Sequence, residues 1–202
     1  MIPPAEMHMV TADGLDLAAL EVPHPRPFAL RHVPDPAVAS HGIPHVNNVA
    51  YVSWLDRAAE LHADALGWTR AAMAADDLAW FVGRHEISYR AEAWPGDELL
   101  LLTWIRRVHR FTAEREVLVL RTAAADEAPG RPPARDRERD DAGAPAPPAS
   151  PEVICRGLST WVLVTLSTRR PRRHDAAMLE AFDPLLPVEA APEPSPGAGV
   201  AP

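Results

Sequence analysis

Four consecutive residues, His45, Val46, Asn47 and Asn48, combine polar side chains with the predicted start of a long helix. Asparagine is favoured at the N-cap of a helix, and the first backbone N–H groups of a helix have no partner within it. Those N–H groups and the positive end of the helix dipole can polarise a carbonyl oxygen. Asparagines also cap helices that have no catalytic role, and a single loop histidine is usually only solvated, so both interpretations stay open.

A second group of candidate residues is the densest basic cluster outside the Arg-rich stretch before residue 151: Arg169, Arg170, Arg172 and Arg173. Guanidinium groups bind phosphate through paired hydrogen bonds, so one of these side chains is a candidate for contact with a phosphate-bearing ligand. A solvated surface segment explains the same run equally well.

The helix that would position the first group is predicted from His45 to Gly67, because asparagines cap its start and glycine suits the left-handed position after its end. One face should pack on a sheet, since its side chains recur every three or four residues: Val52, Leu55, Ala59, His62 and Leu66. His62 on this face is interpreted as a core histidine.

Two further side chains of this helix bear on the site. Tyr51 lies one turn beyond the two asparagines and suits either packing or substrate contact. Glu60 is nine residues further on and roughly half a turn out of phase with Tyr51. We therefore do not expect Glu60 to act as a catalytic carboxylate.

The other segments predict one mostly antiparallel sheet. Residues 94–97, Trp-Pro-Gly-Asp, are typical of a type II turn between two antiparallel strands. Strands are expected over 28–32, 78–94 with an interruption near Gly83, 98–108, 111–121 and 153–166, and a short helix over 175–182. Residues 98–108 are apolar on nearly every position, which indicates a central strand covered on both faces. The fold class is α+β, with one long central helix packed on a five-stranded sheet.

Composition restricts the possible functions. The chain has 202 residues, a formal charge of -8 and a pI of about 5.5, with 47% hydrophobic and 24% charged residues. This size fits a single domain, and the acidic balance argues against nucleic acid or an anionic membrane as partner. Cys155 is the one cysteine, which excludes an intrachain disulfide and a thiolate metal cluster. No metal site, secretion signal or membrane-spanning run is evident, so a cytoplasmic location is expected.

The chain divides into three parts. Residues 1–25 are expected to form an N-terminal arm and residues 26–183 the domain. Within the domain, the Ala-, Pro-, Asp- and Arg-rich stretch at about 124–151 is expected to be a disordered insertion in a hairpin, and residues 184–202 a disordered tail.

Three segments resemble the 4-hydroxybenzoyl-CoA thioesterase-like branch of the hotdog fold, whose layout is a strand, a long helix and a four-stranded meander. HVNNVAYVSWLDRA (45–58) is similar to the junction of loop and central helix. RHEISYRAEAWPGDELLLLTWI (84–105) is similar to the second and third strands with their turn, and STWVLVTLSTRRPRR (159–173) with the following LEAF is similar to the closing strand.

The resemblance implies hydrolysis of an acyl-CoA thioester to a free acid and coenzyme A, without a cofactor. Val46, Asn47 and Asn48 would polarise the thioester carbonyl or hold the water, and His45 would contact that carbonyl or the pantetheine arm. The arginine cluster would contact the phosphates of coenzyme A. It also implies a homodimer or higher even oligomer, with two sheets joined edge to edge and each active site between subunits. Residues 99–104 and 153–166 also offer more two-sided apolar strand than one helix can cover.

Two alternatives stay open. One is a thioesterase that acts on a carrier-protein-bound polyketide or fatty chain, although an acidic surface argues against docking an acidic carrier protein. The other is a hotdog domain that binds acyl thioesters without turning them over.

The sequence departs from the family pattern where a catalytic aspartate usually precedes the histidine. Pro44 stands in place of a glycine, His41 takes the place of the aspartate, and Asp35 is the nearest upstream carboxylate. If the loop folds back, Asp35 could act as base or nucleophile at the helix start. Otherwise His41 or His45 takes that role, or hydrolysis is slow and relies on carbonyl polarisation alone.

Overall fold

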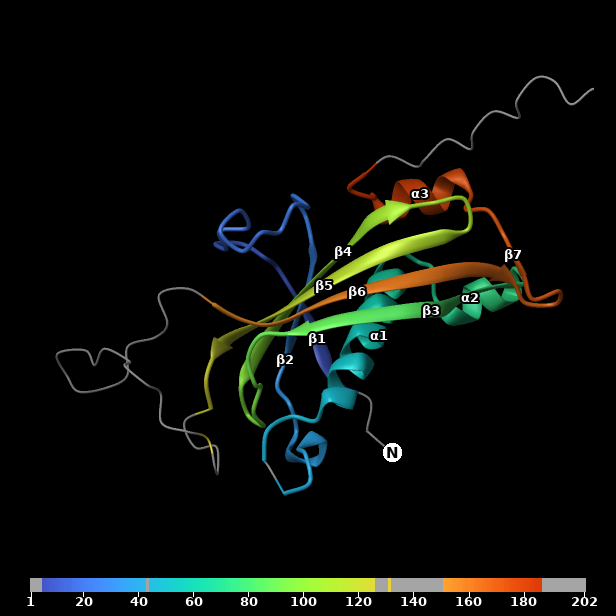
Figure 1. Ribbon diagram of the computed structural model, residues 1–202. Coiled ribbons are helices and arrows are strands. Elements are labelled where there is room, and N and C mark those ends of the chain that lie inside the picture. The colour runs from blue at the N-terminus through green and yellow to red at the C-terminus, as the bar shows by residue number, and fades with distance from the viewer. Residues whose placement is uncertain (1–4, 43, 126–130, 132–150, 187–202) are drawn as a thin grey trace, which may run out of the picture.

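The computed structural model describes residues 5–42, 44–125, 131 and 151–186. In chain order its elements are β1 (Met7–Val10), β2 (Phe28–His32), the short 3-10 helix η1 (Pro36–Val38), α1 (Asn48–Ala65), α2 (Arg70–Ala75), β3 (Leu78–Tyr89), β4 (Glu98–Val108), β5 (Thr112–Ala123), β6 (Glu152–Thr165), β7 (Arg170–Pro171) and α3 (Ala176–Phe182). Helix α1 crosses one face of a curved sheet, and α2 and α3 lie at the end where β3 begins and β4 ends (Figure 1). This is the predicted α+β hotdog arrangement.

The sheet differs from the prediction in two ways. The described residues form seven strands rather than five, in the order β1-β2-β4-β5-β6-β3 with β7 beside β6, and every pairing is antiparallel. The additional strands are β1, within the predicted arm, and the two-residue β7. The predicted meander is wrong as well, because β3 pairs with β6 and not with β4. Strands β1 and β3 are therefore the two edges.

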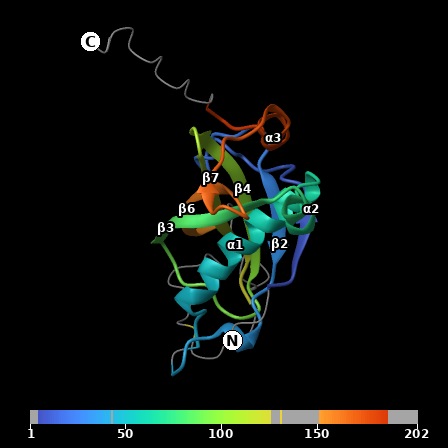
Figure 2. The ribbon, with the colours of Figure 1, turned by 90° about the vertical axis from the view of Figure 1, so that its right-hand side faces the viewer.

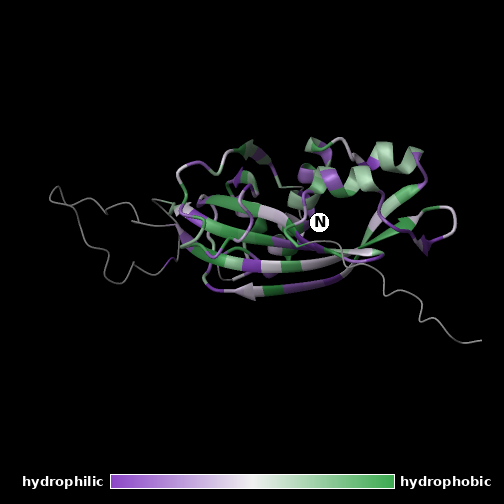
Figure 3. Ribbon diagram, turned by 90° about the horizontal axis from the view of Figure 1, so that it is seen from above, coloured by the Kyte–Doolittle hydropathy of each residue, from purple (hydrophilic) through white to green (hydrophobic). Residues whose placement is uncertain are grey.

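Strands β4 and β5 are buried on both faces, as predicted for residues 98–108. On the inner face their side chains pack against α1, and Leu99, Leu101, Val117 and Val119 share one cluster with Trp54 and Leu55. On the outer face Leu100, Leu102, Trp104, Leu118 and Leu120 pack against Leu20 and Val22, with Leu15 and Leu17 beside them. Figure 3 shows hydrophobic green bands along these strands. Residues 15–22 thus cover the second face within one chain, so the two-sided strands do not by themselves require a second copy.

Helix α1 begins as predicted, with Asn47 as its N-cap, and ends before Gly67, whose φ is +84°. The face that it turns to the sheet is rotated from the predicted one, because Trp54 and Ala58 are buried while Val52 and Leu66 stay partly exposed. The helix approaches β6 closely at Gly157, where a Cβ atom would lie 2.4 Å from Cδ2 of Leu55. Glycine at this position lets the helix sit close to the sheet. Figure 2 shows α1 lying across the strands.

Two glycines shape β3 and the turn that precedes β4. The register of β3 against β6 shifts between Val82 and Arg84, so the predicted interruption near Gly83 is a bulge. In the turn before β4, Gly96 has φ +83° and the Asp97 N–H donates to the Trp94 carbonyl oxygen at 3.1 Å, as a type II turn requires.

Candidate active site

The loop before α1 folds back on itself. Ala39 and Val46 form an antiparallel bridge, and the backbone N–H of Asn47 donates to the carbonyl oxygen of Val38 at 2.9 Å. The end of η1 therefore lies beside the start of α1. Asp35 caps the opposite end of η1, so its role as a base stays a prediction.

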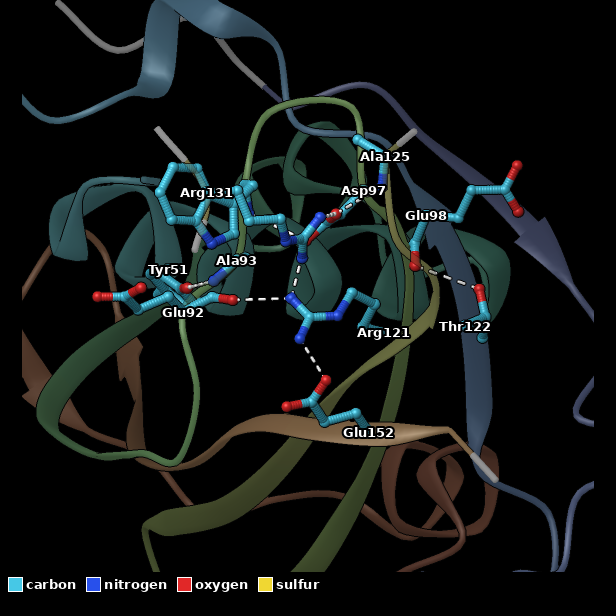
Figure 4. A network of polar contacts seen from close by, with 11 residues as sticks. Tyr51, Glu92, Ala93, Asp97, Glu98, Arg121, Thr122, Ala125, Arg131 and Glu152 are labelled. Atoms are coloured by element: carbon cyan, nitrogen blue, oxygen red, sulfur yellow. Dashed lines mark hydrogen bonds and ion pairs between the residues drawn. The ribbon is translucent and has the colours of Figure 1, made fainter. Parts of the chain in front are cut away.

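The segment after β3 braces the start of α1. The Val46 N–H donates to the Ala93 carbonyl oxygen at 2.8 Å, and the Tyr51 hydroxyl accepts from the Ala93 N–H at 3.0 Å (Figure 4). The Tyr89 hydroxyl donates to the carbonyl oxygen of Asn48 at 3.3 Å. Tyr51 is only 2% exposed, and burial raises its pKa to about 12. Within one protomer Tyr51 is thus enclosed and holds the bracing segment in place.

The first turn of α1 leaves one backbone donor free. The Asn47 side chain accepts from the Val49 N–H at 2.9 Å, and the Ala50 N–H donates to the Asn47 carbonyl oxygen at 2.9 Å. For the N–H of Asn48, an exposed residue, the part of the chain that the structure describes supplies no acceptor. This donor, at the positive end of an 18-residue helix, can polarise a carbonyl oxygen.

The three candidate bases differ in their surroundings. The Asp35 carboxylate is exposed and accepts from the Ala37 N–H at 2.7 Å, so it caps η1. His41 is exposed on the loop. Nδ1 of His45 lies 3.9 Å from Oε1 of Glu92 and has no hydrogen-bond partner among the described residues. His45 is therefore the candidate base that the fold places directly beside the start of α1.

A buried carboxylate organises the turn next to this brace. Asp97 is fully buried and accepts from the Trp94 N–H at 3.0 Å, from Arg121 at 3.0 Å and from both terminal nitrogens of Arg131 at 2.8 and 3.2 Å (Figure 4). Burial alone would raise the pKa of Asp97, but the hydrogen bonds from Arg131, the backbone N–H groups of Ala125 and Trp94, and Arg121 outweigh it and lower that pKa. Asp97 is consequently ionised at neutral pH.

Arg121 links this carboxylate to the brace, because it also donates to the Glu92 carbonyl oxygen at 2.8 Å and pairs with Glu152. Arg131 belongs to the stretch predicted as a disordered insertion, and its guanidinium lies 5.8 Å from the ring centre of Trp94. Sequence reasoning interpreted Asp97 only as a turn residue. The sequence feature that could have indicated its burial is its position, directly after Pro-Gly and directly before a largely apolar strand.

The arginine cluster lies far from the start of α1 within one protomer. All four side chains are exposed, and Arg170 pairs with Thr165, which in turn pairs with Leu78 at the beginning of β3. The start of α1 contacts Tyr89 at the other end of that strand. A strand of 12 residues spans roughly 35 Å. The structure thus brings together residues 45–48 and Tyr51, but not the arginines, within one chain.

A cavity of about 480 Å³, partly open to solvent, lies between the second half of α1, α2, α3, the start of β3 and the strands β4, β5 and β6. Its walls are largely apolar and include the aromatic side chains of Trp68, Trp80, Phe81, Trp161 and Phe182. Glu60 also lines it and is paired with Arg57 at 2.6 Å and Arg70 at 3.2 Å. This cavity was not predicted from the sequence, because neither α2 nor the pairing of β3 with β6 was expected.

One charged group reaches the cavity from the sheet. Arg115 is 4% exposed, and its Nη1 lies 2.9 Å from Nδ1 of His62 and donates to Oγ1 of Thr103 at 3.1 Å. Burial, together with the charge of Arg115, lowers the pKa of His62 to about 3, so its ring is neutral and can accept this hydrogen bond. Burial lowers the pKa of Arg115 to about 9, which leaves the guanidinium protonated at neutral pH. The sequence signal was a charge within the otherwise apolar row of alternate residues 113–119.

Within the described ranges, no helix is long and apolar enough to cross a membrane. The same residues contain no group of three histidine, cysteine or acidic side chains arranged as metal ligands.

Comparison with known proteins gives one family match. The family model of the thioesterase-like superfamily matches residues 43–182, whereas no curated protein matches the chain significantly. Among solved structures, a thioesterase-superfamily protein from Jannaschia sp. CCS1 is 17% identical with a TM-score of 0.62, and the match covers 90% of this chain and 94% of that one. A 1,4-dihydroxy-2-naphthoyl-CoA thioesterase from Synechocystis is 14% identical with a TM-score of 0.58, over 77% of this chain and 95% of that one.

A longer structure from Lactobacillus plantarum, described as an oleoyl thioesterase, is 15% identical with a TM-score of 0.60. The match covers 86% of this chain but only 57% of that one. At such identities these structures show the shared hotdog fold.

Proposed function

The chain belongs to the thioesterase-like superfamily, and from this we propose that it hydrolyses an acyl-CoA thioester to a free acid and coenzyme A. The observation that carries the proposal is the exposed start of α1, where the Asn48 N–H has no acceptor among the described residues and His45 lies alongside. The Synechocystis structure of the same fold is a CoA thioesterase, which supports the choice of coenzyme A. The net charge of -8 supports a substrate other than nucleic acid or membrane, and we propose a cytoplasmic location.

In the proposed reaction the thioester carbonyl oxygen accepts a hydrogen bond from the Asn48 N–H. His45 removes a proton from a water held by the exposed Asn48 side chain, and the resulting hydroxide attacks the carbonyl carbon. The carbon–sulfur bond then breaks, and the thiolate of coenzyme A leaves and takes up the proton. Oε1 of Glu92 lies 3.9 Å from Nδ1 of His45, beside the start of α1. Asp35 and His41 remain the alternative bases.

A complete site requires a second copy of the chain, and we propose that the copies join through β3. This strand is an edge of the sheet, and Phe81, Val82 and Tyr89 on it are 45%, 38% and 44% exposed. An unpaired, partly apolar edge is a template for another strand. Antiparallel pairing about a two-fold axis at the midpoint of β3 places Tyr89 of one protomer beside Leu78 of the other.

This arrangement would unite the separated parts of the site. Tyr89 contacts the start of α1, whereas Leu78 lines the cavity and lies one strand away from the arginine cluster. The start of α1 of one protomer would therefore face the cavity and the arginines of the other. The acyl group would enter the cavity, the thioester would lie at the Asn48 N–H, and Arg169, Arg170, Arg172 or Arg173 would contact the phosphates of coenzyme A. Val46, Asn47 and Tyr51 would position that helix start.

The test is release of free thiol from a panel of acyl-CoAs, at enzyme concentrations far below substrate. Multiple turnovers on at least one acyl-CoA are expected. A protein that binds acyl-CoA and releases no thiol would instead be a binding domain, and release only from acylated carrier protein would establish the carrier-protein alternative.

A further inference from the structure

The cavity holds a positive charge that the described residues do not balance. Arg115 lines the cavity and is 4% exposed. Among the described residues its hydrogen bonds go to the neutral groups of His62 and Thr103, and its guanidinium lies 5.9 Å from the ring centre of Phe182. Among the described residues no carboxylate oxygen lies within 4.0 Å of its guanidinium nitrogens. An unpaired buried charge is strongly unfavourable, so its presence indicates a partner that the described residues do not supply.

Three acidic side chains line the cavity, and two of them are already engaged. The third, Asp64, is exposed and is not within ion-pair distance of Arg115. Glu60 pairs with Arg57 and Arg70, and Asp56 lies 3.3 Å from Arg70. Neither therefore serves as the missing counter-ion of Arg115.

The guanidinium retains a geometry suited to a carboxylate. Its Nη1 makes both of the hydrogen bonds to His62 and Thr103, which leaves Nε and Nη2 without an acceptor among the described residues. These two N–H groups form the side of the guanidinium that binds a carboxylate in a bidentate manner. Nε1 of Trp161, another lining residue, is likewise buried without a hydrogen-bond partner in the described chain. It offers a further donor to an oxygen in the cavity.

From this geometry, and resting on the proposed function, we infer that the acyl group of the substrate carries a carboxylate at its far end and that Arg115 binds it. The aromatic walls would hold the apolar body of the acyl group between thioester and carboxylate. An acyl group without the carboxylate would leave Arg115 unpaired, and a site with a buried polar group discriminates strongly against a ligand that lacks the matching partner. The substrate class is therefore an ω-carboxyacyl thioester.

The experiment compares CoA half-thioesters of dicarboxylic acids with four to ten carbons against fatty acyl-CoAs of equal length. We expect kcat/KM to favour the ω-carboxyacyl substrate by about 100-fold or more at the best length. Arg115→Met should remove this preference, because it keeps the bulk of the side chain and removes the charge. Arg110→Met, which removes an exposed arginine, serves as the control and should retain it. Absence of a preference at every length, or a preference that survives Arg115→Met, would overturn the inference.

A second measurement separates this inference from the proposed hydrolysis. Free dicarboxylic acids should raise the Tm of the wild type more than monocarboxylic acids of equal length, and Arg115→Met should cancel the difference. If the protein releases no thiol yet binds diacids through Arg115, the proposed function fails and the inference stands. If the protein hydrolyses acyl-CoAs but does not bind diacids through Arg115, the proposed function stands and the inference fails. If Arg115→Met does not fold, Arg115→Gln takes its place, and the wild-type preference alone still decides.

Discussion

Arg131 places its two terminal nitrogens 2.8 and 3.2 Å from the two carboxylate oxygens of Asp97, which is fully buried in the turn before β4. The pair joins a residue that follows β5 to the segment that braces the start of α1. Composition predicts a stretch around Arg131 too polar to pack, yet this one side chain satisfies a buried charge.

Arg131→Ala should therefore reduce the free energy of unfolding by about 2 kcal/mol, the cost of one lost charged hydrogen-bond pair while Arg121 still contacts Asp97. Arg26→Ala is the matched control, because Arg26 and Asp183 form an ion pair with side chains 79% and 54% exposed. The control should cost less than about 1 kcal/mol. Urea unfolding of both variants measures the difference, and equal losses would mean that the Asp97 pair is no stronger than a surface pair.

Stability should depend on pH through Asp97. Its pKa in the folded protein is lowered, so the unfolded chain binds the proton first as the pH falls. The stabilisation from this group is complete above its model-compound pKa of 3.8 and is lost as the pH falls from there through the folded value. Wild type should therefore lose more stability than Asp97→Asn between pH 5 and pH 2. If the stability of both proteins falls with pH in parallel, Asp97 does not contribute to acid unfolding.

His45→Ala should lower the single-turnover rate of thioester hydrolysis by 10²- to 10⁴-fold, the usual loss on removing a general base. Asp35→Asn and His41→Ala test the two alternatives under the same conditions. His8→Ala, at an exposed histidine of β1, is the control and should change the rate less than twofold. If the three site variants fold and all stay within a few-fold of the wild-type rate, none of these residues is the base.

The proposed dimer predicts different hydrogen exchange at the two edge strands. The β3 amides that do not pair with β6 should be protected at micromolar concentration and lose protection on dilution, because their acceptors belong to another protomer. Amides on the free edge of β1 provide the internal control and should exchange quickly at every concentration. A monomeric mass by light scattering, with equal exchange at both edges, would refute the dimer and the shared site.

Local patterns predict the local structure of this chain well. Residues 28–32 and 98–108 form strands with the predicted ends, because apolar runs bounded by turn residues determine where a strand begins and stops. The bulge at Gly83 and the turn at Gly96 follow from the conformations that glycine permits. The polar start of α1 was found in the same way, because helix caps are chosen among a few residue types.

Features that depend on contacts between distant segments were not predictable. A pattern of period two identifies β3 as a strand but does not say that it lies beside β6. The apolar face of α1 spans Trp54 as well as Leu55, and only the position of the sheet decides which side is turned inward. The cavity combines residues from α1, α2, β3 and α3 with residues of the sheet. The position of Arg115 inside it can be recognised only after these elements have been placed.

The cover formed by residues 15–22 limits how far this protein can assemble. Two sheets stack face to face only when their facing side chains interdigitate across a gap of about 10 Å. Here Leu20 and Val22 already occupy that layer over β4 and β5. Joining at β3 would use the bare edge next to the cavity and leave the outer sheet face shielded, so a dimer formed in this way could grow only through the other edge strand, β1.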